Sequence, residues 1–166
     1  MKVTIGIIIV LLIALGVWLS LTAGHIEPSQ QAGQTASSTP AGWVVYSDAA
    51  GRFSVSYPQG YSANGAVFTI PASLYQGTNL SSDTSISVVD IPQGQDCKDA
   101  SSTDAGAGNR YEETVFATPI ASGCLAVRYF VHYGAIENYP QDAVREFDRQ
   151  ALLAQFDAIR ATLVVR

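Results

Sequence analysis

Signatures of the common catalytic and nucleotide-binding sites are absent from this sequence of 166 residues. It contains no G-x-S-x-G elbow, no H-E-x-x-H zinc helix, no phosphate-binding loop and no dinucleotide fingerprint. The aspartates in the middle of the chain lack the spacing of a calcium-binding loop; they are Asp83, Asp90, Asp96, Asp99 and Asp104. We therefore expect no metal and no cofactor, and no enzyme class that a short motif would identify.

Basic residues are few and scattered along the chain. The sequence has 9 Lys and Arg against 14 Asp and Glu, which gives a net charge of −5. Binding to a phosphate backbone requires clustered Lys and Arg side chains. The composition therefore disfavours nucleic acid as a partner.

Cysteine is also scarce, since Cys97 and Cys124 are the only two. They form no C-x-x-C motif and have no nearby histidine ligands, so neither a redox pair nor a zinc site is favoured. In an oxidising compartment, an even number of cysteines indicates a disulfide. We predict a structural disulfide between Cys97 and Cys124.

Charge is absent between Val3 and Ala23, where Ile, Leu, Val, Ala and Gly predominate. About 20 apolar residues suffice for a helix to span the hydrocarbon of a bilayer. Lys2 precedes this run and no Lys or Arg follows until Arg52, so the positive-inside bias keeps the N-terminus in the cytoplasm. We expect residues 1–23 to be a single-pass signal anchor in the cytoplasmic (inner) membrane. Cleavage as a secretory signal peptide is the alternative.

The chain after this segment divides into a linker and a domain. Residues 24–42 are rich in Ser, Thr, Gln, Gly and Ala without apolar periodicity, which is typical of a disordered linker. Residues 43–166 are expected to form a domain outside the cytoplasm.

Strand patterns dominate the first part of this domain. Two β-rich runs, 43–46 and 53–58, flank a turn with Asp and Gly and predict a β-hairpin. Further strands are expected at 66–70, 85–91, 110–117 and 124–133. In the last of these, alternation predicts one apolar face of Leu125, Val127, Tyr129, Val131 and Tyr133.

A helix pattern closes the chain. Leu152, Phe156, Ile159 and Leu163 recur at helical spacing, and Asp148 stands where an N-cap is expected. This stripe should cover the apolar face of the last strand. The predicted fold class is α+β, a mostly antiparallel β-sheet packed by a C-terminal amphipathic helix and preceded by an N-terminal transmembrane helix.

Two stretches resemble a known family. Residues 46–58 combine an aromatic residue, a Gly-x-Phe-Ser element and a Tyr-Pro end, and resemble the signature that opens PsbP-like domains. Residues 147–163 are similar to the last helix of those domains. The resemblance implies a small sandwich with an antiparallel sheet and flanking helices, and an extracytoplasmic accessory role without known catalysis. The chain is also similar to bacterial membrane-anchored proteins that carry this cysteine pair.

The candidate site lies on the mixed face of the last strand. Arg128, Phe130 and His132 share that face, and Glu112 would lie beside them if the two last strands pair. One interpretation is a small anion or carboxylate site with a bidentate contact from Arg128. The other is an exposed ion pair between Arg128 and Glu112, with His132 half-exposed. An exposed Phe130 would suggest a protein partner in the cell envelope.

These features lead to two hypotheses about function. The first is a membrane-tethered extracytoplasmic domain that serves as a non-catalytic interaction or accessory module. The second is an envelope hydrolase that uses His132 as a base with a serine from a turn. A serine oxygen beside His132 in a concave pocket would favour the hydrolase.

Overall fold

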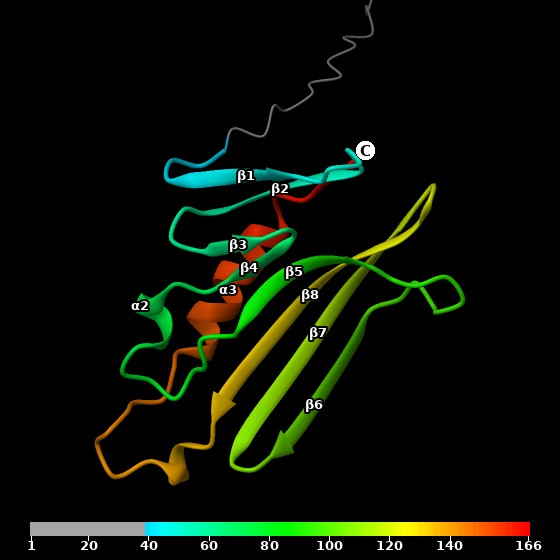
Figure 1. The fold of residues 1–166 in the computed structure, drawn as a ribbon. Helices are drawn as coiled ribbons and strands as arrows, with labels where there is room; N and C mark the ends of the chain where they lie inside the picture. Colours follow the sequence, from blue (N-terminus) through cyan, green and yellow to red (C-terminus); the bar gives the residue numbers. More distant parts are fainter. Residues whose placement is uncertain (1–38) are drawn as a thin grey trace, which may run out of the picture. The chain divides into compact units, whose positions relative to one another are not determined.

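The structure is a computed structural model that describes residues 39–166. The predicted membrane anchor, residues 1–23, and most of the predicted linker lie outside the described residues. Within residues 39–166, no helix combines the length and the apolar character needed to cross a bilayer. The described chain forms two β-sheets with a C-terminal helix (Figure 1).

The first sheet has three strands in the order β1-β2-β9. They are β1 (Trp43–Ser47), β2 (Phe53–Pro58) and β9 (Val164–Val165), and both pairings are antiparallel. The predicted hairpin is confirmed, with Trp43 opposite Pro58 and Ser47 opposite Ser54. The C-terminus lies beside β2 (Figure 1), where β9 pairs with its first two residues. Strand β9 is not predictable from the sequence, because two residues are too few to show alternation.

The second sheet has six strands in the order β3-β4-β5-β8-β7-β6, all antiparallel. Three of the predicted strands are confirmed with small changes at their ends, as β5 (Ser85–Asp90), β7 (Asn109–Ile120) and β8 (Gly123–Gly134). A fourth, expected at 66–70, is shorter and is β4 (Val67–Thr69). Two strands were not predicted, β3 (Ser62–Asn64) and the edge strand β6 (Ala100–Gly106).

Strand β6 forms without any apolar alternation, and all of its residues are exposed. It pairs with β7 through the two-residue turn Ala107–Gly108, in which both residues have positive φ, +49° and +81°. A turn of this kind matches the twist of the flanking strands. The strand therefore exists because β7 supplies its hydrogen-bonding partner.

The helix α3 (Arg149–Arg160) confirms the predicted C-terminal helix. The Asp148 carboxylate caps its first turn by accepting a 2.9 Å hydrogen bond from the amide of Ala151. Leu152, Phe156 and Ile159 of the predicted stripe are buried, and the Phe156 ring lies 5.2 Å from that of Tyr129 on β8. The prediction that Leu163 belongs to the helix was wrong, because α3 ends at Arg160. The apolar face of β8 is thus covered by α3, as predicted.

The described chain also contains two short helices, α2 (Ala72–Tyr75) and η1 (Ile136–Asn138).

One buried amide joins the end of β8 to the segment that precedes α3. Asn79 is only 3% exposed. Its Nδ2 donates to the carbonyl of Gly134 at 2.8 Å, and its Oδ1 accepts from the amide of Phe147 at 3.0 Å. The side chain satisfies two backbone groups that would otherwise be buried without partners.

Candidate functional site

The predicted site residues lie on the face of the six-stranded sheet that is turned away from the apolar side of β8, which we call the outer face. It is defined by Arg128, Phe130 and His132 on β8, by their partners Val115, Glu113 and Tyr111 on β7, and by Ala100, Ser102 and Asp104 on β6. Arg128, Phe130 and His132 are all half-buried. The structure therefore brings together three of the four predicted residues.

The prediction for Glu112 was wrong. The register places Glu112 opposite Val131 and Glu113 opposite Phe130, so the Glu112 side chain lies on the face that α3 covers. Arg128 instead forms its ion pair with Glu113. The sequence showed that only one of the two adjacent carboxylates can lie on this face of the strand, and the register between β7 and β8 decided that it is Glu113.

Glu113 and Arg128 each shift the pKa of the other. The hydrogen bond from Arg128 lowers the pKa of Glu113 below its usual value, despite the opposing effect of partial burial. The same bond raises the pKa of Arg128. A carboxylate ligand would have to displace Glu113 from Arg128, so the geometry favours the ion pair over the predicted anion site.

The His132 ring contacts two polar side chains, Asp83 and Asn109. Its Nδ1 lies 2.8 Å from Oδ1 of Asp83, and its Nε2 lies 3.0 Å from Oδ1 of Asn109. The ring also stacks on Tyr111 with 4.4 Å between centroids.

The contacts of the His132 ring test the hypothesis that His132 is the base of a hydrolase. A base for a serine nucleophile uses a free ring nitrogen to receive the hydroxyl proton. In His132, the nitrogen opposite the Asp83 contact is bonded to Asn109, and no serine in residues 39–166 forms a hydrogen bond with the ring. The described residues therefore do not assemble the predicted catalytic pair.

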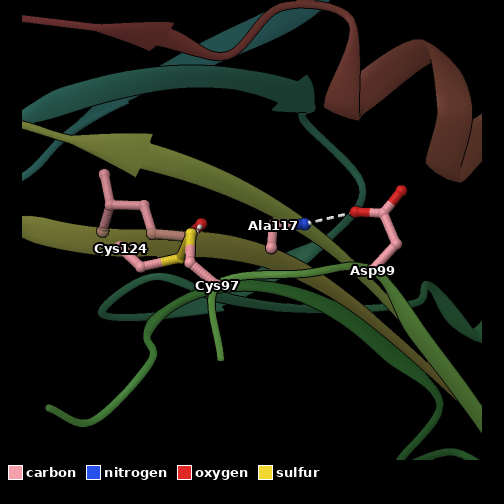
Figure 2. Close-up of a disulfide and its surroundings, with 5 residues drawn as sticks. Cys97, Asp99, Ala117 and Cys124 are labelled. Carbon is pink, nitrogen blue, oxygen red and sulfur yellow. Dashed lines mark hydrogen bonds between the residues drawn. A yellow bond between two sulfur atoms is a disulfide. The ribbon is translucent and has the colours of Figure 1, made fainter. Parts of the chain in front are cut away.

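The predicted disulfide is confirmed. Figure 2 shows the bond between Cys97 and Cys124, whose Cα atoms are 5.8 Å apart. Close to it, the Asp99 carboxylate accepts a 2.8 Å hydrogen bond from the amide of Ala117 on β7 (Figure 2). Both contacts hold the loop between β5 and β6 against the β7–β8 hairpin, so they position the start of the edge strand β6.

Three adjoining hollows on the outer face share Glu113 as a lining residue. The largest, about 510 Å³, lies beside the disulfide loop and also contacts Val89, Ile91 and Arg128. The second, about 370 Å³, lies toward the β6–β7 turn and includes Tyr111 and Phe130. A shallow depression of about 70 Å³ lies along β6. The three hollows adjoin one another along β6 and β7.

Within the described part of the chain, no group of three His, Cys, Asp or Glu side chains is arranged to hold a metal ion. Searches of protein-family models, curated proteins and solved structures found no match to this chain.

Proposed function

We propose that this protein is a membrane-tethered, extracytoplasmic binding module without catalytic activity, and that a protein of the cell envelope binds its outer face. The observation that carries the proposal is the pair of rings at Tyr111 and Phe130, which lie on the outer face away from α3 and remain partly accessible. Aromatic residues are enriched at protein interfaces because they contribute large contact areas. The PsbP-like resemblance remains a prediction that agrees with an accessory role.

The disulfide supports a location outside the cytoplasm. Cys97 and Cys124 are joined, and no cysteine is left free. Disulfides of this kind persist in oxidising compartments and are rare in the reducing cytosol. Lys2 precedes the apolar run and no Lys or Arg follows it until Arg52, which also supports a location of residues 43–166 outside the cytoplasm.

Photocrosslinking tests whether the outer face binds a partner. Benzoylphenylalanine is introduced at Phe130 of the full chain in cells, and at Val45 as a control, since Val45 is 52% exposed on β1. We expect a light-dependent adduct of defined mass at position 130 and none at position 45. Absence of an adduct at position 130, or equal adducts at both positions, would contradict the proposal.

Protease accessibility and N-terminal sequencing test the tether. We expect the protein to retain Met1 or Lys2 and to resist carbonate extraction from membranes. Protease added outside the cytoplasmic membrane should release a compact fragment that begins near Trp43. A mature terminus at Gly24 or His25 would instead identify a freely secreted domain, and a domain shielded from protease would show the inverse orientation.

A further inference from the structure

The hollow of about 370 Å³ on the outer face combines aromatic walls with carboxylates. Its lining residues on the outer face are Ser102, Asp104, Tyr111, Glu113 and Phe130. The Tyr111 and Phe130 rings are nearly parallel, with an interplanar angle of 26° and 6.3 Å between centroids. Ser102 lies opposite Glu113 in the sheet, and its small side chain leaves the space above that position open.

The charges around this hollow favour a cation. Asp104 lies opposite Tyr111, and its Oδ1 accepts only the amide of Ala105, at 2.8 Å. Within residues 39–166, Asp104 forms no salt bridge, so its charge is not neutralised by Lys or Arg. No lining residue is basic. His132 stacks on the Tyr111 ring, and Arg128 lies over the Phe130 ring and pairs with Glu113, so among the described residues Asp104 is the unpaired carboxylate beside these rings. A carboxylate next to an aromatic ring attracts an organic cation.

Within the domain, the Phe130 ring already contacts a cationic side chain. The Arg128 guanidinium carbon lies 5.3 Å from the centroid of the Phe130 ring. A cation can therefore approach this face of the sheet and be held by an aromatic ring and a carboxylate together, as Arg128 is held by Phe130 and Glu113.

We propose that this hollow receives the ammonium or guanidinium group of a Lys or Arg side chain from a protein partner. The inference rests on the proposed function and specifies the chemistry of the partner. A protein side chain fits better than a free amine, because Glu113 connects the hollow to the larger one beside the disulfide loop. Within residues 39–166, strand β6 is the last strand of the sheet, and its outer edge beside the hollow can pair with an extended chain.

Fluorine NMR of the full chain in detergent micelles tests this proposal. A 4-fluorophenylalanine at position 130 reports on the hollow during titration with N-acetyl-arginine amide, N-acetyl-lysine amide and the neutral N-acetyl-citrulline amide. We expect saturable shifts with the two cations only, and weaker binding as salt concentration rises. Asp104→Asn should weaken binding by about threefold or more, as expected for loss of a partly exposed charge contact.

Asp142→Asn is the matched control. Asp142 is also exposed, and its positive φ of +61° suits asparagine. This variant should bind both cations like the parent, and both variants should keep the melting temperature of the parent. Equal binding of the citrulline probe, or an unchanged affinity in Asp104→Asn, would overturn the proposal. Tighter binding of putrescine than of the capped residues would assign the hollow to a free amine instead.

Different experimental outcomes reject the binding module and the cation-binding hollow. A crosslinked adduct at position 130 in cells, with no response to the cationic probes, would leave the binding module intact and reject the cation receptor. Binding of the probes without any adduct in cells would retain the cation chemistry and reject the protein partner, and with it the assignment to a partner side chain.

Discussion

Nε of Arg149, the first residue of α3, lies 3.1 Å from Oε2 of Glu112 on β7. The other oxygen of the same carboxylate accepts a 3.0 Å hydrogen bond from the hydroxyl of Tyr133 on β8. One carboxylate thus connects the start of the helix to two neighbouring strands. Glu112 is therefore a structural residue on the covered face of the sheet, whereas its neighbour Glu113 belongs to the outer face.

This contact predicts a pH dependence of stability. Partial burial raises the pKa of Glu112, but the hydrogen bonds from Arg149 and Tyr133 and the charge of Arg149 outweigh it, so the pKa lies below its usual value. A carboxyl with a lowered pKa in the folded state stabilises the protein fully above its unfolded pKa of about 4.3. That contribution is lost as pH falls through the folded pKa. We expect the free energy of unfolding to decrease between about pH 5 and pH 3.

Urea denaturation of variants at several pH values measures this contribution. Glu112→Gln should lower the free energy of unfolding at pH 7 by about 1 kcal/mol and should reduce its acid dependence. Glu146→Gln, which changes an exposed carboxylate, is the control and should retain the acid dependence of the parent. An unchanged pH profile in Glu112→Gln would contradict the assigned role.

The interface between α3 and the sheet depends on Phe156, which is 0% exposed. Phe156→Ala should lower the free energy of unfolding by about 3–5 kcal/mol, because it leaves a cavity against Tyr129. Phe156→Asp should prevent folding at 25 °C, since it buries a charge. Urea denaturation measures both, with Val45→Ala on the exposed face of β1 as a control. A parent-like midpoint for Phe156→Asp would show that the helix face is assigned wrongly.

The disulfide is expected to contribute substantially to stability. The two cysteines are 27 residues apart in the sequence, and closing a loop of this length stabilises a fold by about 3–4 kcal/mol in the chain-entropy treatment. Replacement of both Cys97 and Cys124 by serine should lower the free energy of unfolding by that amount. Thiol labelling of the denatured, unreduced protein should detect no free cysteine, and labelling after reduction should detect both. Two reactive thiols before reduction would disprove the bridge.

The β6–β7 turn contains an unfavourable residue. Ala107 has a φ of +49°, in the left-handed region that costs a residue with a Cβ atom about 1–2 kcal/mol. Ala107→Asn creates the Asn-Gly pair preferred in this turn type and should raise the free energy of unfolding by about 0.5–1 kcal/mol. Gly108→Ala should have the opposite effect, because Gly108 has a φ of +81° and an added Cβ would lie 2.3 Å from Nδ2 of Asn138. Lower stability of Ala107→Asn in thermal denaturation would contradict this description of the turn.

Local patterns in the sequence were sufficient to predict the elements that bury apolar surface. Alternation identified β8 and its apolar face, helical spacing identified the stripe on α3, and Asp148 identified the helix start. The two cysteines indicated their own pairing because there is only one way to join them. Each of these signals is found among a few neighbouring residues or in the number of cysteines.

The tertiary structure alone decided the elements and contacts that depend on a distant partner. Strands β6 and β9 bury too little apolar surface to show a pattern, and they form because β7 and β2 present free backbone groups to them. The identity of the carboxylate beside Arg128 depended on the register between β7 and β8. A shift of one residue moves every side chain of a strand to the other face, so this register, and not the spacing in the sequence, placed Glu113 on the outer face and Glu112 against α3.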